Sequence, residues 1–138
     1  MEISDITTPA LAYLGDSVLE VCVRTYLVNE RGFSTSAHLN RASLDFVRAT
    51  VQSEAMGRIE PYLTAEETNA YRRGRNMGHG NIPKSASVAE YRRATGMETL
   101  FGYLHLTGQA QRIDFLFRVG YRLIPDAPDI IQSGEQPT

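Results

Sequence analysis

The chain has 138 residues, a mass of 15.4 kDa, a formal net charge of −2, 42% hydrophobic and 22% charged residues, which predicts one folded globular domain rather than a disordered chain. A single cysteine excludes a disulfide scaffold, and three widely spaced histidines fit no structural zinc spacing. No apolar stretch is long enough to cross a membrane and the first residues do not form a signal peptide, so we expect a cytoplasmic protein.

The first predicted helix runs from Thr8 to about Asn29. Thr8 is the expected N-cap and Pro9 the first helical residue, where the missing N–H costs no hydrogen bond. At 100° per residue the apolar side chains cover more than half of this helix, which favours a homodimer that buries the same face of both copies. Asp16 lies at the edge of the largely buried face, and Gly15 beside it predicts the close approach of another backbone.

Two further helical regions are predicted in the middle of the chain. The first covers about residues 36–57, and Pro61 interrupts the pattern that follows it. The second begins after Thr64, which forms a capping box with Glu67, and it is expected to end at Gly74.

Residues 74–83 read as a loop, because four of the ten are glycine or proline. Two capping-box patterns follow, Ser87 with Glu90 and Thr95 with Glu98. The pair of patterns leaves open whether this stretch is one helix or two.

Gly108 closes that region, and a last helix is predicted from about Gln109 to Leu123. Three prolines make residues 125–138 a flexible tail, so the folded domain is expected to span residues 1–124. No segment alternates apolar and polar residues over the length of a strand, and no Asn-Gly or Asp-Gly turn is present. The fold class predicted is therefore all-α.

Two carboxylates stand out because each lies in a largely apolar helix. Asp16 is one, and Glu98 is the only formally charged residue of 96–106. If Gly15 and Gly102 let the two helices pack closely, the carboxylates meet, and they repel each other unless a cation lies between them. Oxygen ligands of this kind favour Mg²⁺ or Mn²⁺. A structural interpretation stays open, in which Asp16 pairs with an arginine and Glu98 only caps its helix.

Basic residues cluster in one part of the chain. Residues 72–93 hold six of the fourteen basic residues against one acidic residue. Arg72, Arg73 and Arg75 end a helix, and Lys84 follows the glycine-rich loop. Guanidinium groups suit phosphate oxygens, so this cluster is predicted to contact a nucleic-acid backbone. The alternative is a solvated helix end whose arginines satisfy the last carbonyls.

Two acidic segments carry a family resemblance. The sequences LAYLGDSVLE at 11–20 and TGMETLFGYLHL at 95–106 resemble the two acidic helices of the ribonuclease III family. With YRRGRN at 71–76, IPK at 82–84 and no double-stranded-RNA-binding domain, the chain is similar to the small bacterial Mini-III branch.

The resemblance implies a homodimeric helical bundle like the ribonuclease III endonuclease domain, which uses Mg²⁺, or Mn²⁺ in its place, to cut double-stranded RNA into products with 5′-phosphates. It makes Asp16 and Glu98 the catalytic and metal-binding residues and adds Asn76 to the expected RNA contacts. It further implies a role in maturation of the large-subunit (23S) ribosomal RNA precursor, with a ribosomal protein bound to the substrate as a further partner. The competing interpretation is a non-catalytic helical dimer that binds RNA or protein.

The chain departs from the full-length family at two positions. Ala12 and Thr95 stand where that family carries acids, and the Mini-III branch looks similar in both respects. Fewer carboxylates then remain to hold a metal, and Asp45, Glu54 and Glu90 are the candidates to complete its coordination.

Overall fold

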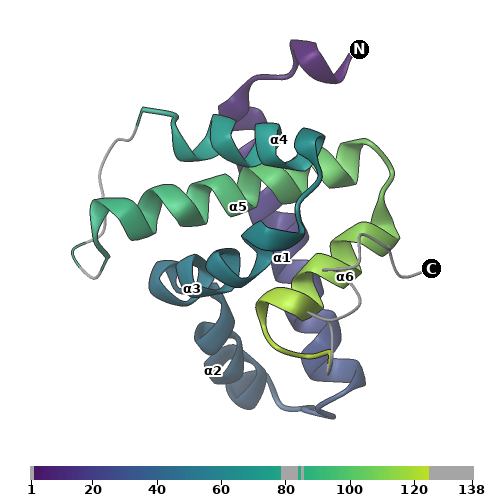
Figure 1. Ribbon diagram of the computed structural model, residues 1–138. Coiled ribbons are helices and arrows are strands. Elements are labelled where there is room, and N and C mark those ends of the chain that lie inside the picture. Colours follow the sequence, from purple (N-terminus) through teal and green to yellow (C-terminus); the bar gives the residue numbers. More distant parts are fainter. Residues whose placement is uncertain (1, 79–83, 85, 125–138) are drawn as a thin grey trace.

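The computed structural model describes residues 2–78, 84 and 86–124, and all regular structure in these residues is helical (Figure 1). The predicted all-α class is therefore confirmed. The predicted loop residues 79–83 and the predicted tail 125–138 lie outside the described residues. The elements are η1 (Ile3–Asp5), α1 (Thr8–Asn29), α2 (Ser36–Val47), α3 (Ala49–Ile59), η2 (Glu60–Tyr62), α4 (Ala65–Arg75), α5 (Val88–Leu106) and α6 (Ala110–Gly120).

Helix α5 is the centre of the bundle. In Figure 1, α1 passes behind it, α4 lies above it and α3 lies below it, and all three contact it. The side chains of Met97, Leu100, Phe101 and Leu104 are fully buried, so α5 supplies the middle of the hydrophobic core. A helix that neighbours cover on three sides is apolar around most of its circumference, and α5 has this character from Ala94 to Leu104.

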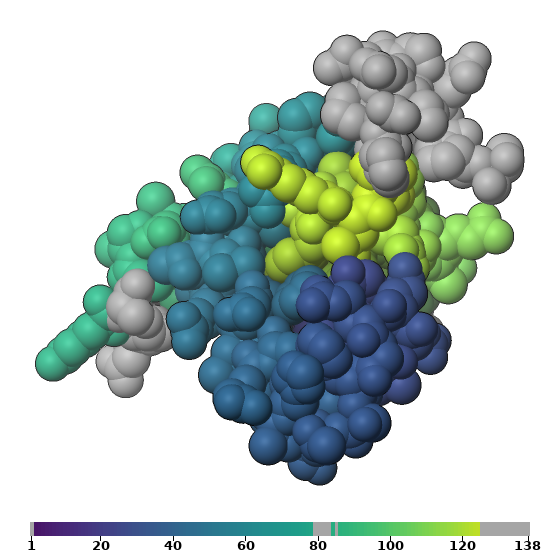
Figure 2. All heavy atoms as spheres, turned by 90° about the horizontal axis from the view of Figure 1, so that it is seen from below, coloured from purple at the N-terminus to yellow at the C-terminus, as the bar shows by residue number. Residues whose placement is uncertain are grey.

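Helices α2 and α6 lie at the end of the bundle that is away from α4 (Figure 1). Figure 2 shows α2 and the C-terminal part of α1 side by side, with α6 next to them, and α6 also packs on α3. No residue of α2 is buried, whereas α6 buries five residues, among them Leu116 and Phe117. Within the described residues, no helix combines the length and the apolar character needed to cross a membrane.

The N-terminus of α1 differs from the prediction by one residue. Thr7, not Thr8, is the N-cap, and its side-chain oxygen accepts a hydrogen bond from the backbone N–H of Ala10 at 3.2 Å. Pro9 therefore occupies the second helical position. Thr8 is used differently, because its hydroxyl accepts a hydrogen bond from Arg73 at 3.2 Å. Two adjacent threonines offer the same cap chemistry, so only the tertiary contact distinguishes them.

The region predicted as one helix over 36–57 is two helices. The chain breaks at Arg48, whose φ of −65° and ψ of 143° are extended. No glycine or proline lies near this break. The turn lets α3 bury Ala55, Met56 and Ile59 against the core, while α2 remains partly exposed. Tertiary packing therefore sets the break.

Helix α5 is continuous, which settles the question of one helix or two. The Ser87 and Glu90 capping box is confirmed, because each side chain bonds the backbone N–H of the other, at 3.1 and 2.9 Å. The second predicted box is wrong. Thr95 lies inside the helix, and its hydroxyl donates to the carbonyl oxygen of Tyr91 at 3.0 Å. Glu98 is therefore free of any capping role.

A buried ion pair joins α4 to α6. The predicted capping box of Thr64 and Glu67 is present at the start of α4. The Glu67 carboxylate, 3% exposed, also accepts two hydrogen bonds from Arg112 of α6 at 2.7 and 2.8 Å. Arg112 donates a third to the carbonyl oxygen of Tyr62 at 2.6 Å. These bonds compensate the cost of removing both charged groups from water, a cost that an unpaired buried charge would leave uncompensated.

Two helix ends also differ from the prediction. Helix α4 continues one residue past Gly74, because this glycine serves as a packing position: a Cβ there would overlap the side chain of Thr99 on α5. Helix α6 ends at Gly120 rather than at Leu123. Arg122 has a φ of 58°, in the left-handed region, so the helix cannot continue through it.

Candidate active site

The candidate site lies where α1 crosses α5, and two glycines set the distance between the helices. A Cβ on Gly15 would overlap the carbonyl oxygen of Glu98, and a Cβ on Gly102 would overlap the carbonyl oxygen of Leu11. The backbones are thus in direct contact at both positions. The close approach predicted from these glycines is confirmed.

The crossing brings Asp16 and Glu98 together. Asp16 lies close enough to Glu98 for its charge to raise the pKa of the Glu98 carboxyl group, so the two acids meet as the glycines predicted. One detail is a correction: Asp16, which was predicted at the edge of a largely buried face, is exposed, and Glu98 is the partly covered member. No ion pair to Asp16 occurs among the residues that the structure describes, so the alternative pairing with an arginine is not found.

Burial raises the pKa of Glu98 to about 8, and the neighbouring charge and hydrogen bond of Asp16 add to the increase. At neutral pH the Glu98 carboxyl group therefore keeps its proton for most of the time.

These residues fit a divalent cation as a two-carboxylate site. A cation beside the pair could take the place of the Glu98 proton, so that both groups are ionised. Carboxylate oxygens are ligands that Mg²⁺ and Mn²⁺ prefer. No third acid or histidine of the described residues completes a cluster with them. Asp45 and Glu54 are exposed on α2 and α3, and Glu90 caps α5. The remaining ligands would be water and substrate oxygens.

The raised pKa of Glu98 gives a pH-dependent stability without metal. Because its folded-state value is above its unfolded value, the folded chain binds more protons between about pH 4.5 and pH 8, and the free energy of unfolding falls as the pH rises through that window. Glu98→Gln removes this titration. We expect the variant to match wild type near pH 4 and to exceed it by about 2–4 kcal/mol at pH 8. Urea unfolding in the presence of a metal chelator measures the free energy of unfolding of both proteins across this pH range. Parallel pH profiles for the two proteins would contradict the raised pKa of Glu98.

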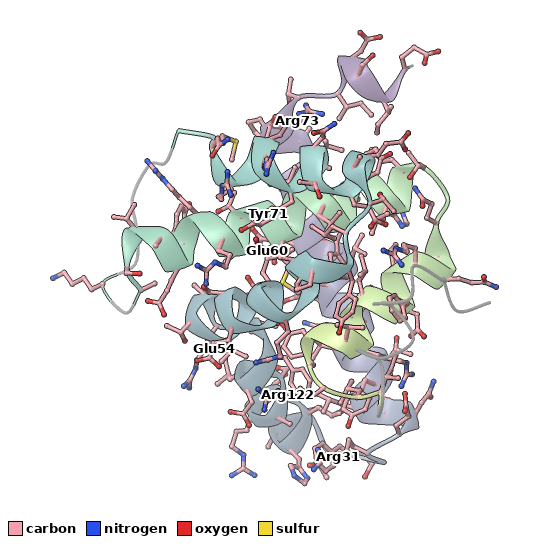
Figure 3. All side chains as sticks on the ribbon, in the orientation of Figure 1. Arg31, Glu54, Glu60, Tyr71, Arg73 and Arg122 are labelled. Carbon is pink, nitrogen blue, oxygen red and sulfur yellow. The ribbon has the colours of Figure 1, made fainter. Side chains whose placement is uncertain are left out.

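The residues of the predicted basic cluster have different surroundings. Arg73 lies at the top of α4 in Figure 3, and its guanidinium donates to the carbonyl oxygen of Ile6 at 2.9 Å and to the hydroxyl of Thr8 at 3.2 Å. Arg73 thus fastens the N-terminal segment to α4.

The other members differ from Arg73 and from each other. Arg75 donates to the side-chain oxygen of Asn76 at 3.2 Å, and its guanidinium lies 5.6 Å from the centre of the Tyr71 ring. Arg72 and Lys84 are exposed, and neither side chain makes a hydrogen bond or an ion pair within the part of the chain that the structure describes.

Sequence analysis did not single out Arg92 and Arg93 of α5, although both belong to the basic stretch. The structure places them beside Arg75 and Asn76 in the lining of one pocket. The Ser87 cap was the signal in the sequence, because a helix that begins at Val88 has Arg92 and Arg93 in its second turn. The structure places that turn close to the end of α4.

Comparisons with known proteins agree with this geometry. Residues 9–109 match the family model for the ribonuclease III domain. A Mini-ribonuclease 3 of Symbiobacterium thermophilum is 44% identical over 126 residues, which cover 91% of this chain and 90% of the relative. A Mini-ribonuclease 3 of Enterococcus faecalis is 42% identical, covering 78% and 82%. A crystal structure of a Fusobacterium nucleatum protein superposes with a TM-score of 0.77 at 27% identity, over 87% of this chain and 95% of that one.

The match to the family model covers all of α5 and all of α1 except its first residue, and these are the two helices that bring the carboxylates together. The relatives match over most of their own length as well as most of this chain. The chain therefore belongs to the ribonuclease III family, in its Mini-ribonuclease 3 branch, and is an endoribonuclease of that family.

Proposed function

We propose that Asp16 and Glu98 together hold a Mg²⁺ ion, which Mn²⁺ can replace, and that the chain uses this site to hydrolyse phosphodiester bonds of double-stranded RNA. The observation that carries this proposal is the pair of neighbouring carboxyl groups at the crossing of α1 and α5, where Gly15 and Gly102 bring the two backbones into contact. When bound, the metal supplies an activated water and stabilises the charge that develops on the phosphate and the leaving oxygen.

The two carboxylates have different parts in this site. Asp16 is exposed, so a phosphate group of the RNA can approach it from solvent. Glu98 is partly covered behind it and gives up its proton when both groups become ligands. The crossing of α1 and α5 sets their spacing, because the two backbones are already in contact at Gly15 and Gly102.

The test is cleavage of a duplex RNA by the purified chain in Mg²⁺, in Mn²⁺ and in a chelator. We expect products with 5′-phosphate ends in the two metals and intact RNA in the chelator. Duplex binding without cleavage in any metal would favour the alternative, a non-catalytic helical module.

The natural substrate that we propose is a double-stranded segment of the large-subunit (23S) ribosomal RNA precursor, cut in the cytoplasm with a ribosomal protein bound to it. The resemblance to the Mini-III branch supports this assignment. In cells that lack the enzyme, precursor ends should persist on large-subunit RNA, and restoring wild type but not Asp16→Asn should remove them.

We propose that the chain acts as a homodimer, so that two copies of the site face one duplex. Three apolar side chains of α1 are exposed in the single chain: Tyr13 is 84% exposed, Val21 63% and Val28 53%. A two-fold interface would bury the same stripe on both copies. We expect sedimentation at micromolar concentration to give about twice the mass of 15.4 kDa. Tyr13→Glu should shift it toward the monomer, and a wild-type monomer would contradict the proposal.

Arg72 and Lys84 are proposed to contact RNA phosphates, since their charges have no partner among the described residues. Each alanine variant should reduce the slope of log affinity against log salt by about 0.7–0.9. It should weaken binding to duplexes of different sequence by the same factor. Arg73→Ala is expected to change the slope less, because Ile6 and Thr8 already take part of its donor capacity. Fluorescence anisotropy in Ca²⁺ measures the slopes, and unchanged slopes for Arg72→Ala and Lys84→Ala would remove these residues from the interface.

A further inference from the structure

A pocket lies on the side of α5 that faces away from α1. Its volume is about 530 Å³, and it is bounded by the last turn of α4, by η2 and by the first turns of α5. Three arginines line it, Arg75 from α4 and Arg92 and Arg93 from α5. A cavity of this size with three guanidinium groups in its wall has the composition of an anion site.

The single acidic residue of the lining does not cancel this charge. Glu60 accepts a hydrogen bond from the hydroxyl of Tyr71 at 3.2 Å, and Figure 3 shows the two side chains directed toward each other. Its carboxylate is thus already engaged at one edge of the pocket. Three positive groups and one negative group leave an excess of positive charge in the lining.

Contacts within the protein hold the guanidinium groups of Arg75 and Arg93 in place. Arg93 donates to the hydroxyl of Ser53 at 3.2 Å, and Ser53 is only 2% exposed. Arg75 lies over the Tyr71 ring and donates to Asn76, which also lines the pocket. Side chains that are ordered before a ligand arrives lose less entropy on binding it.

We propose that this pocket binds one phosphate group, and that its occupant is a phosphodiester of the RNA at a distance from the bond that is cut. Arginine forks and the Asn76 side-chain amide can donate to phosphate oxygens, and the first turn of α5, at Val88 and Ala89, adds the positive end of a helix dipole. The identity of the occupant as RNA rests on the proposed function, whereas phosphate binding itself does not.

The pocket and the carboxylate pair are separate sites. Arg92 and Arg93 precede Glu98 by six and five residues, which places them about 120–140° around α5 and about 8–9 Å along its axis. Figure 1 shows α1, which carries Asp16, behind α5, whereas Glu60 and Tyr71 lie on the near side in Figure 3. A phosphate in the pocket therefore cannot be the one that reaches Asp16. The pocket positions the RNA, and the carboxylates cut it.

Inorganic phosphate is the probe for the pocket itself. In wild type, NMR titration should give saturable shifts of the Val88 and Ala89 amides. Arg75→Ala should weaken binding about tenfold or more, and Arg75→Ala with Arg93→Gln should abolish it. Arg41→Ala, which removes the same charge from exposed α2, is the matched control and should bind as wild type does. Arg75 alone is included because the Ser53 contact makes the Arg93 change riskier for folding. Shifts that do not saturate in wild type, or equal affinity in all variants, would overturn the proposal.

Duplex RNA distinguishes the source of the phosphate. Binding is measured with the full chain carrying Asp16→Asn, in Ca²⁺ and across a salt series. Because the arginines share one phosphate, the double variant should reduce the salt slope by about 0.7–0.9 in total, not by that amount for each arginine. If phosphate binding is lost while the slope and RNA affinity stay the same, the occupant is free phosphate and the assignment to RNA is wrong. If wild type never cleaves RNA but the phosphate titration behaves as expected, the proposed function fails and the pocket remains.

Discussion

Asp16→Asn is expected to abolish cleavage of duplex RNA, by at least about a thousandfold, while the fold and the oligomeric state stay unchanged. The substitution keeps the shape of the side chain and removes the charge that a cation needs. Loss of a metal that stabilises the transition state by several kcal/mol corresponds to a rate loss of this size. Asp16 is exposed and makes no ion pair within the described part of the chain, so its replacement should cost little stability.

Glu20→Gln is the matched control, because Glu20 lies one helical turn further along α1 and forms an exposed ion pair with Arg24 at 3.4 Å. It should cut RNA at nearly the wild-type rate. Single-turnover cleavage with excess enzyme, together with circular dichroism of each variant, separates a chemical defect from unfolding. Near-normal cleavage by folded Asp16→Asn protein would exclude Asp16 from the reaction.

Gly15→Ala is expected to destabilise the fold by about 1–3 kcal/mol or more and to separate the two carboxylates. The new Cβ would meet the carbonyl oxygen of Glu98, which is backbone and cannot rotate away as a side chain can. Helices α1 and α5 must therefore move apart, and overpacking of this kind costs about 1–3 kcal/mol or more. Because Asp16 and Glu98 lie at the same crossing, activity should fall even at temperatures where the variant remains folded.

Gly57→Ala is the control for the helix-propensity part of this change. Gly57 lies in α3, is exposed, and has open space where its Cβ would be built. Alanine in an open helix position should stabilise the protein by about 1 kcal/mol. Thermal unfolding and cleavage assays of both variants give the comparison. Equal unfolding temperatures for Gly15→Ala and Gly57→Ala would mean that the crossing is not as tight as the structure has it.

The meeting of Asp16 and Glu98 could be predicted although the two residues are distant in the chain, because local residue types mark where their helices can approach. Two acids in apolar helices are unusual, and a glycine beside each one indicates close packing. Helix starts were predictable for the same reason: the side chains of Thr64 and Ser87 satisfy backbone N–H groups of their own helices, in a pattern that is local in the chain.

The parts that could not be predicted depend on contacts between distant segments. The break at Arg48 has no local marker, since it results from how α3 packs on α5 and α6. The helical wheel gives the direction of Asp16 on α1 but does not say which neighbours cover that direction, so its exposure was missed. The cluster of Arg73 with Ile6, more than sixty positions away, and the pocket at Arg93 likewise exist only after the helices have packed.

Titration with Mn²⁺ tests the central claim, that Asp16 and Glu98 form one metal site. Isothermal calorimetry or the paramagnetic signal of free Mn²⁺ should show saturable binding to wild type, tighter at pH 8 than at pH 6, because binding displaces the proton of Glu98. Asp16→Asn and Glu98→Gln should each weaken Mn²⁺ binding by at least about tenfold. Because both residues belong to one site, the double variant should bind Mn²⁺ about as weakly as the weaker of the two single variants. Glu20→Gln should leave the Mn²⁺ affinity unchanged. Equal Mn²⁺ affinity in wild type, Asp16→Asn and Glu98→Gln would contradict the account.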